Sequence, residues 1–309
     1  MAPPGAPVPA NLAPYLHAFY IPHEDINLRV VLAKKPDVPA RGTIIIVPGR
    51  TEFIEKYFEM VGDFLERRFA VLVIDHRGQG LSSRLLDDPL KSYVKQFQDY
   101  ADDLGFIVDA LGSHLPKPQI IVAHSMGGCV AFQSVISGTL NPAALICSAP
   151  MLCLYDLHAA PLQWLIKGLA AIGQTTKNVP MMKQTNGLPV KFKRNKLTSD
   201  IVRFTRWSSY FTHIPALRVS VPTIGWLRGA LTSMRFVNRN AEQVKTPTLL
   251  LSAGADPIVD PAAHIQFAEK SGATLKIIPG ARHELFLEAD EFRDQFFESV
   301  DVFLDKNAF

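Results

Sequence analysis

The sequence contains few cysteines, no long hydrophobic run and none of the common cofactor-binding motifs. Its three cysteines, Cys129, Cys147 and Cys153, stand among apolar neighbours and cannot all pair, which predicts buried, reduced thiols in a reducing compartment. No stretch reaches the roughly 20 apolar residues that a membrane-spanning helix needs. There is no phosphate-binding loop and no cluster of His, Cys and Asp at metal-ligand spacing, so we expect neither a cofactor nor a bound metal.

The N-terminal segment lacks the features of a signal peptide. "MAPPGAPVPANLAPY" is rich in proline and has neither a basic start nor an apolar run. We therefore expect residues 1–18 to form a flexible, proline-rich lead-in. Together with the cysteines, this predicts a cytoplasmic protein, and a further hypothesis places it peripherally at the inner face of the membrane.

The segment "DHRGQGLSS", residues 75–83, follows an apolar run and is similar in outline to a dinucleotide-binding loop. It lacks the third glycine of that motif, and its acid stands ahead of the glycines rather than about 20 residues after them. We interpret it as a turn.

Most of the sequence is a regular alternation of short apolar runs and helical patterns. Strands are expected at residues 17–24, 26–35, 42–49, 69–75, 119–125, 143–150, 246–256 and 274–280, and helices at 55–68, 97–115, 127–137, 261–272 and 291–306. The first two strands are expected to pair in antiparallel fashion. Several of the others are apolar throughout, which is typical of parallel strands buried on both faces. The sequence thus predicts an α/β fold with a mostly parallel sheet and helices on both faces.

Residues 151–240 interrupt this alternation. Residues 160–174, 199–214 and 222–237 have helical patterns, and a polar, lysine-rich stretch separates the first two. An insertion that leaves after one sheet strand and returns before the next predicts a helical cap over the carboxyl edge of the sheet, where open α/β sheets bind ligands. We therefore expect a core of residues 19–150 and 241–309 and a cap of residues 151–240.

The expected cap is basic and holds all three tryptophans, Trp164, Trp207 and Trp226. It contains 13 lysines and arginines against two acids, whereas the rest of the chain contains 19 basic and 27 acidic residues. One interpretation is that this surface contacts anionic membranes or anionic head groups. The other is that the tryptophans form a small core and the lysines a solvated face. A nucleic-acid partner is not expected if a catalytic site lies beneath.

Ala123 to Gly127 match a nucleophile elbow, in which a serine stands between a strand and a helix and is flanked at two residues' distance by small residues. Such a turn presents the Ser125 hydroxyl above the sheet. It also places the Met126 backbone N–H at a helix N-terminus, where it can stabilise an oxyanion. The alternative is that Ser125 merely caps the following helix.

A nucleophilic serine needs a base, and the base needs an orienting acid. On this kind of fold the order along the chain is Ser, acid, His. Asp256 ends the segment 246–256, just past its apolar run, and His283 follows the strand at 274–280, so both loops lie at the same sheet edge as Ser125. Asp260 is the rival acid, but it directly precedes Pro261 and is better explained as a helix N-cap. For the other histidines, including His124 and His264, we expect surface or packing roles.

A second oxyanion donor is expected in the loop after the strand at 42–49. In "VPGRTEF", Gly49 allows the turn and the Arg50 backbone N–H is the candidate. The Arg50 side chain could meet an anionic group, although a salt bridge to an acid such as Glu52 is the more ordinary arrangement.

Six segments together resemble the α/β-hydrolase family: "PGRTEFIEKY", "DHRGQGLSSR", "AHSMGG", "SAPML", "GADPIVD" and "GARHELFLE". The resemblance covers about residues 20–305 and is greatest to the monoacylglycerol lipase and bacterial lysophospholipase L2 branch, which "LTSDIVRFTR" and "PTIGWLRGA" also resemble. It implies the following site: Ser125 as nucleophile, Asp256 as acid, His283 as base, and Arg50 and Met126 as oxyanion donors.

Two positions depart from the family pattern. Pro48 stands where relatives often have His before the oxyanion glycine, which leaves the backbone donors in place but changes the outer contacts of the loop. Ala123 replaces the first glycine of the elbow.

The resulting prediction is a serine carboxylic-ester hydrolase that forms an acyl-enzyme and acts on lysophospholipids or monoacylglycerols. Alternatives of the same fold are a hydrolase of small non-lipid esters and an acyltransferase. An alternative of a different class is a non-catalytic ligand-binding protein on a hydrolase scaffold, which the complete triad disfavours.

Overall fold

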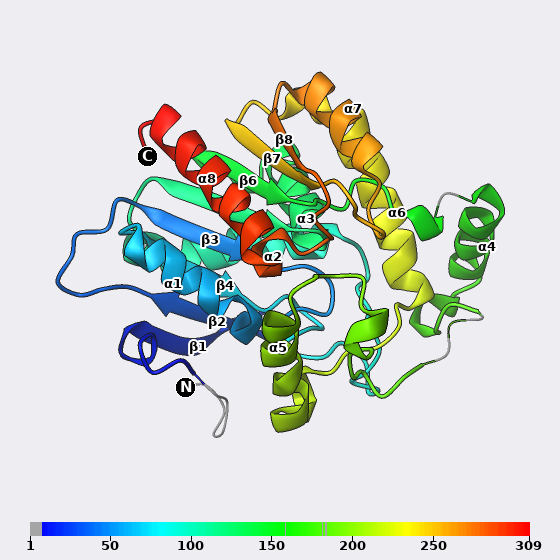
Figure 1. Cartoon of the computed structure of the whole chain (residues 1–309). Coiled ribbons are helices and arrows are strands. Elements are labelled where there is room, and N and C mark those ends of the chain that lie inside the picture. The colour runs from blue at the N-terminus through cyan, green and yellow to red at the C-terminus, as the bar shows by residue number, and fades with distance from the viewer. Residues whose placement is uncertain (1–7, 158, 181, 183) are drawn as a thin grey trace.

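The computed structural model describes residues 8–157, 159–180, 182 and 184–309 (Figure 1). Eight strands of the described chain form one sheet. They are β1 (Leu16–His23), β2 (Ile26–Ala33), β3 (Thr43–Val47), β4 (Ala70–Ile74), β5 (Gln119–His124), β6 (Ala144–Ser148), β7 (Thr248–Ala253) and β8 (Thr274–Ile278).

The strand order is β1-β2-β4-β3-β5-β6-β7-β8. β2 pairs with β1 and with β4 in antiparallel fashion, and every pairing from β4 to β8 is parallel. The predicted mostly parallel sheet and its antiparallel first pair are therefore confirmed. Because β5, β7 and β8 are parallel, the loops that follow them all leave the sheet at the same edge.

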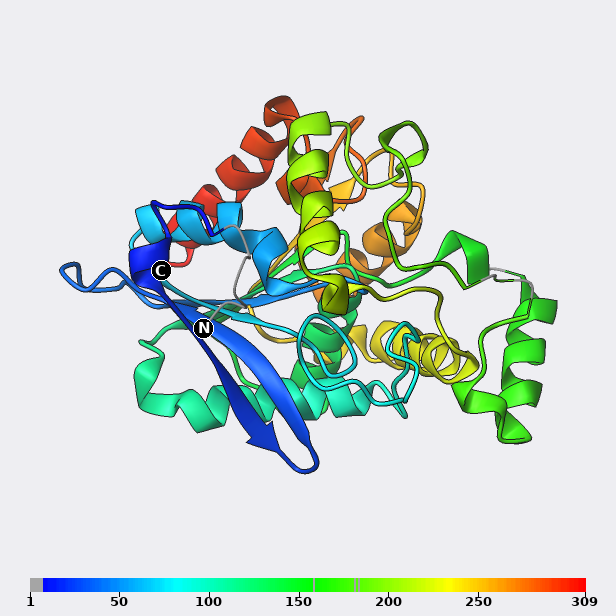
Figure 2. The ribbon, with the colours of Figure 1, turned by 90° about the horizontal axis from the view of Figure 1, so that it is seen from below.

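Helices cover both faces of the sheet (Figures 1 and 2). The longer ones are α1 (Phe58–Glu66), α2 (Gln98–Leu111), α3 (Met126–Ile136), α4 (Ala160–Ala171), α5 (Ile201–His213), α6 (Ile224–Arg239), α7 (Pro261–Ser271) and α8 (Asp290–Lys306). α1 and α8 lie on one face, and α2 and α3 on the other. In the part of the chain that the structure describes, none of them is both long and apolar enough to cross a bilayer.

Each central strand supplies apolar side chains to two separate cores, because successive residues point to opposite faces. Ile44 and Ile46 of β3 pack in the core that includes α1 and α8. Ile45 and Val47 pack in the core that includes α2 and α3. This double burial explains why these strands are apolar throughout, as the sequence indicated.

The chain between β6 and β7 contains α4, α5 and α6. We call residues 151–240 of this segment the insertion. Asp200 and Thr223 cap α5 and α6 by accepting hydrogen bonds from backbone N–H groups. α6 packs against α3, and α4 lies at the edge of the molecule, away from the sheet, in both views (Figures 1 and 2).

The N-terminal boundary of the packed fold differs from the expected one. Leu12 is buried in the core that includes α1, and β1 begins at Leu16. Residues 12–18 are thus part of the fold rather than of a flexible lead-in. Residues 1–7, the rest of the proline-rich segment, lie outside the described residues.

Two further expectations can be compared with the structure. Residues 75–80 form a turn after β4, with Gly78 and Gly80 at positive φ, as predicted. Cys129 and Cys147 are buried thiols, as expected, whereas Cys153 is only half-buried.

Candidate active site

Ser125 stands at the turn between β5 and α3. Its φ of 49° and ψ of −114° place it in a strained region of backbone conformation. Its side chain makes no capping hydrogen bond to α3, so the interpretation of Ser125 as a mere helix cap gains no support. A Cβ at Gly127 would lie 2.1 Å from the Val47 carbonyl oxygen, and glycine therefore allows α3 to approach β3 this closely.

Asp256 and His283 lie in contact in the loops that follow β7 and β8. His283 Nδ1 is 2.6 Å from Asp256 Oδ2, and both residues are buried. The other carboxylate oxygen, Oδ1, accepts hydrogen bonds from the Ile258 and Val259 backbone N–H groups at 2.8 and 3.1 Å. Burial alone would raise the pKa of Asp256, but the contacts with His283 and the two N–H groups outweigh it and lower that pKa. Asp256 is thus an ionised partner for the His283 ring.

The rival acid has the structural role that the sequence indicated. Asp260 is the N-cap of α7, and its side chain accepts a hydrogen bond from the Ala262 N–H at 2.9 Å. His264 is also accounted for, because its two ring nitrogens lie 2.8 Å from Ser252 Oγ and 2.8 Å from the Pro150 carbonyl oxygen.

A cavity of about 520 Å³ brings the candidate residues together at the carboxyl edge of the sheet. Ser125, Met126, His283 and Arg50 line it from the core, and residues such as Leu227 line it from the insertion. Small-molecule sites have volumes of roughly 300–1,000 Å³, so this cavity can hold a substrate. Within the described chain the Ser125 hydroxyl has no hydrogen-bond partner, so the contact between serine and histidine of a working triad is not formed here.

In the loop after β3, the backbone N–H of Arg50 lies between two N–H groups that have acceptors. The Gly49 N–H donates to the Glu52 carboxylate, and the Thr51 N–H donates to the Gln79 side-chain oxygen. The N–H of Arg50, between them, has no partner among the described residues, and neither has that of Met126. The N–H groups of Arg50 and Met126 are the two that the sequence analysis predicts as oxyanion donors.

The turn at residues 75–80 is hydrogen-bonded to the loop after β3. His76 Nε2 is 3.0 Å from the Pro48 carbonyl oxygen, so Pro48 is held through its carbonyl group. Gln79, besides accepting from Thr51, lies 3.9 Å from Met126 Sδ. The segment that was similar to a cofactor loop therefore has a structural role at the site.

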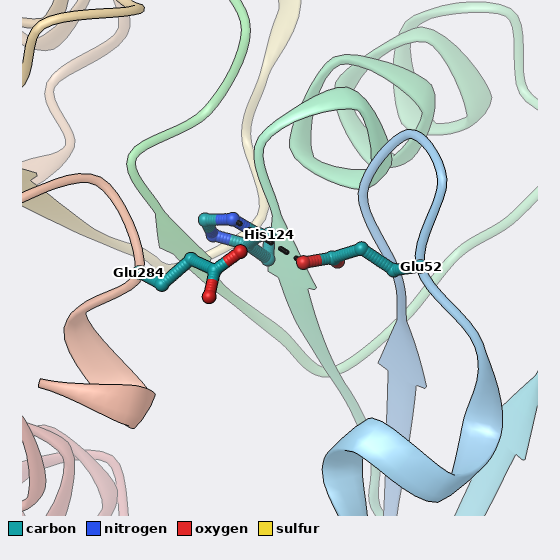
Figure 3. Close-up of side chains that lie close together, drawn as sticks. All are labelled: Glu52, His124 and Glu284. Atoms are coloured by element: carbon teal, nitrogen blue, oxygen red, sulfur yellow. Dashed lines mark ion pairs between the residues drawn. The ribbon is translucent and has the colours of Figure 1, made fainter. Parts of the chain in front are cut away.

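Three buried residues of the cavity wall have their ligand atoms within 4.8 Å of one another: Glu52, His124 and Glu284 (Figure 3). This grouping is similar to a metal site, but a cation is already present. Lys56 Nζ lies 2.8 Å from Glu52 Oε1 and 2.5 Å from Glu284 Oε1. We call Glu52, Lys56 and Glu284 the buried ion triad, in which the ammonium group takes the place that a metal would need.

The protonation states of the buried ion triad follow from its contacts. Burial disfavours the charge on Glu52, but Lys56 and the hydroxyl of Tyr57 outweigh this and lower the Glu52 pKa to about 2. Burial raises the pKa of Glu284 despite Lys56. The same burial lowers the pKa of His124 to about 3, so His124 is neutral at physiological pH.

The Arg50 side chain does not form the salt bridge to Glu52 that was the more ordinary expectation. Glu52 is committed to Lys56, and Arg50 Nη1 instead donates to the Ser220 carbonyl oxygen at 3.0 Å. The guanidinium also lies over the Trp226 ring, 5.4 Å from its centroid. The expectation is wrong because Lys56, one helical turn after Glu52, reaches that carboxylate instead.

The insertion is hydrogen-bonded to the loop that carries His283. The Glu284 N–H donates to the Leu197 carbonyl oxygen at 2.8 Å. Glu288 Oε2 accepts from the Ser199 N–H at 2.7 Å, and Arg282 Nη1 donates to the Thr198 carbonyl oxygen at 3.1 Å. The residues on both sides of His283 are therefore held by the segment just before α5.

Comparison with known proteins gives the family. A family model described as serine aminopeptidase, S33, matches residues 38–290. The chain belongs to this hydrolase family. This S33-family chain is 31% identical over 275 residues to lysophospholipase L2 of Escherichia coli K12, a match that covers 85% of the chain and 80% of the relative. It is also 24% identical to monoglyceride lipase of Saccharomyces cerevisiae, over 87% of the chain and 86% of the relative.

Solved structures give the same fold. A soluble variant of monoglyceride lipase from Saccharomyces cerevisiae, in complex with a substrate analog, aligns with a TM-score of 0.73 at 19% identity and covers 94% of this chain and 96% of its own. A carboxyl esterase from Bacillus coagulans aligns with a TM-score of 0.77 at 19% identity, covering 96% and 99%. The S33-family chain is thus an α/β-hydrolase and, with these relatives, a serine ester hydrolase.

The sequence did not indicate five residues that contact the loops of the site: Glu52, Lys56, His76, Gln79 and Glu284. Glu52 and Lys56 are four residues apart, a spacing that is also typical of exposed helical ion pairs. Only their positions beside the expected oxyanion loop, and that of Glu284 directly after His283, could have suggested otherwise.

Proposed function

We propose that this hydrolase cleaves the ester bond of lysophospholipids or monoacylglycerols through an acyl-enzyme on Ser125. The observation that carries the proposal is the His283–Asp256 contact of 2.6 Å at a cavity that Ser125 also lines. The lysophospholipase and monoglyceride lipase relatives support the choice of a single-chain lipid substrate.

In this mechanism His283 accepts the Ser125 proton as Ser125 Oγ attacks the ester carbonyl carbon. Asp256 holds the imidazole ring by its Nδ1 and stabilises the imidazolium. The carbonyl oxygen, now negative, accepts hydrogen bonds from the Arg50 and Met126 N–H groups. Collapse of the intermediate breaks the bond to the alcohol, which takes the proton from His283. Water then attacks the acyl-enzyme by the same steps and releases the fatty acid.

The cavity lining fits a substrate with one acyl chain. Apolar side chains from the insertion line the cavity that Ser125 also lines, including Met151, Leu154, Leu157 and Leu227. We infer that the insertion acts as the cap of the site, because it contributes this wall.

The three tryptophans of the insertion divide into two groups. Trp207 and Trp226 are 5% and 2% exposed and serve packing, whereas Trp164 on α4 is 70% exposed. Ile172, just after α4, is also 70% exposed, and Lys167 Nζ lies 4.9 Å from the Trp164 ring centroid. We propose that α4 and the basic segment around Lys191 contact an anionic lipid surface.

The nucleophile and its acid can be tested with a fluorophosphonate probe and a series of p-nitrophenyl esters. We expect Ser125→Ala to abolish labelling, and Asp256→Asn to lower kcat/KM by about 10³-fold to 10⁴-fold. The matched control is Asp260→Asn, which removes the acid that caps α7 and should leave kcat/KM within about twofold. Equal losses in the two Asp variants would contradict the assignment.

The chain length of the ester series separates the alternatives. A kcat/KM that rises toward medium or long acyl chains supports the lipid substrate, whereas a preference for short chains indicates a small-ester hydrolase. Product esters formed with an added alcohol would indicate an acyltransferase. A folded wild-type protein that the probe does not label, with or without detergent, would favour the ligand-binding alternative.

The lipid contact has its own test. Charge reversal at Lys191, Lys193 and Arg194 should sharply weaken binding to vesicles that contain anionic lipid. The control reverses three exposed lysines of the core: Lys245, Lys270 and Lys276. Equal binding by both variants would refute the contact.

A further inference from the structure

Arg50 has a charged side chain in the cavity with no carboxylate to pair with. Its guanidinium has five N–H donors, and the structure uses one of them, toward the Ser220 carbonyl oxygen. No ion pair joins Arg50 to any described acid. Partly buried arginines are ordinarily paired, because an unpaired charge loses hydration without compensation.

The nearby acids are not available to Arg50. Glu52, two residues further on, is committed to Lys56 together with Glu284. Asp256 is committed to His283. Asp156 lines the same cavity from the insertion, but it is exposed to solvent.

The environment keeps Arg50 charged and fixed in place. Burial lowers the pKa of Arg50 to about 10, which still leaves the guanidinium protonated at neutral pH. The Trp226 ring beneath it and the Ser220 carbonyl group hold it within the cavity, which Trp226 and Ser220 also line. A charged guanidinium group that is fixed in place and has unused N–H donors is suited to bind phosphate or carboxylate.

The position of Arg50 relates this charge to the reaction. The backbone N–H of Arg50 is one of the two proposed oxyanion donors, so its side chain leaves the loop next to the ester carbonyl. In a lysophospholipid, the glycerol backbone separates the scissile ester from the phosphate by a short link. A phosphate there would lie near the reacting ester, and a neutral monoacylglycerol would have no group to match it.

We propose that the Arg50 side chain binds the phosphodiester of a lysophospholipid head group and makes the enzyme favour lysophospholipids over monoacylglycerols. This inference rests on the proposed function, since it concerns the same site. It assigns Arg50 two separate roles, one for its backbone and one for its side chain.

The first test compares two substrates with the same acyl chain, lauroyl-lysophosphatidylcholine and monolauroylglycerol, both below their micellar concentrations. We expect Arg50→Met to lower the ratio of their kcat/KM values about tenfold to a hundredfold, because charge-assisted hydrogen bonds are lost to one substrate only. Arg50→Lys, which keeps the charge but not the planar fork, should give an intermediate ratio. The ratio cancels any disturbance of the oxyanion loop that affects both substrates alike.

The control is Arg239→Met, which removes one positive charge from an exposed position outside the cavity. An unchanged ratio in Arg50→Met, or an equal fall in Arg239→Met, would overturn the inference while leaving the ester hydrolase in place.

The second test does not depend on turnover. Calorimetry with Ser125→Ala should detect binding of sn-glycero-3-phosphocholine, and the added Arg50→Met substitution should abolish it. Binding that survives this substitution overturns the inference, as does inorganic phosphate that binds as tightly as the diester, since that indicates a general anion site. If the wild-type protein cleaves neither lipid and the probe does not label Ser125, the proposed function fails, whereas the calorimetry still decides the role of Arg50.

Discussion

Replacing Lys56 by methionine tests the buried ion triad. The ammonium group lies 2.8 and 2.5 Å from two buried carboxylates, and methionine keeps its apolar volume but removes its charge. Removing one partner of a buried ion pair costs about 3–5 kcal/mol of unfolding free energy, because a charge is left without compensation. Folded domains have only about 5–15 kcal/mol in total, so the effect should be large.

The structure also indicates which of the two carboxylates causes most of this loss of unfolding free energy. Glu52 keeps two donors without Lys56, the Gly49 N–H and the Tyr57 hydroxyl. Glu284 loses the partner of Oε1, and its Oε2 already has no hydrogen-bond partner in the described structure. The second substitution Glu284→Gln should therefore restore more than half of the loss in Lys56→Met, and Glu52→Gln should restore less.

The pH dependence gives an independent check. In Lys56→Met the folded-state pKa of Glu284 stays above its unfolded value of about 4.3. Below about pH 4.3 Glu284 is protonated in both states, and its neutral form is compatible with burial. The loss of unfolding free energy caused by Lys56→Met is therefore small there, and it grows as pH rises through the raised pKa of Glu284. Urea unfolding at about pH 5 and pH 7.5 measures this.

The control for Lys56→Met is Lys35→Met, which breaks an exposed pair with Glu66 and should cost about 0.5 kcal/mol or less. A loss below about 1 kcal/mol in Lys56→Met at pH 7.5, or a better rescue by Glu52→Gln than by Glu284→Gln, would refute this account of the buried ion triad.

Two more predictions concern backbone packing and a buried histidine. Gly127→Ala places a Cβ 2.1 Å from the Val47 carbonyl oxygen, so α3 must shift by about 1 Å. This shift moves Ser125 and should lower kcat/KM about a hundredfold. It should also lower the free energy of unfolding by about 1–3 kcal/mol. Gly168→Ala, in open space on α4, should instead stabilise the protein by about 0.5–1 kcal/mol, and opposite signs in urea unfolding check the pair. Because burial lowers the pKa of His76 to about 4, from about 6.5 unfolded, the wild-type protein should lose up to about 3 kcal/mol as pH falls from 6.5 to 4. His76→Gln should lack this contribution, and equal pH slopes for the two proteins would contradict the assignment.

The sequence predicted what local patterns and chain order determine. Periodicity and turn chemistry predict the apolar strands, the helices and the turn at residues 75–80. They also predict Asp260 as the N-cap of α7, and the structure contains all of these features. The positions of Asp256 and His283 after β7 and β8 also follow from chain order, because parallel strands end at one edge.

The partners of charged side chains could not be predicted in the same way. Lys56 reaches Glu284 across 228 residues of sequence, and no local pattern indicates such a contact. The same lack of information led to the wrong expectation for Arg50, whose nearest acid in the sequence is taken by another cation. The burial of Leu12 was missed because proline-rich composition was given more weight than a single apolar side chain.

The hydrogen bonds between the insertion and the loop around His283 have a consequence for protein engineering. Leu197, Thr198 and Ser199 contact the residues on both sides of the histidine through main-chain groups as well as side chains. A chimera that takes residues 151–240 from a relative would therefore replace groups that hold the loop around His283, the proposed general base. Such a graft would need the loop at 282–288 from the same donor, so the natural unit of exchange consists of two segments that are far apart in the gene.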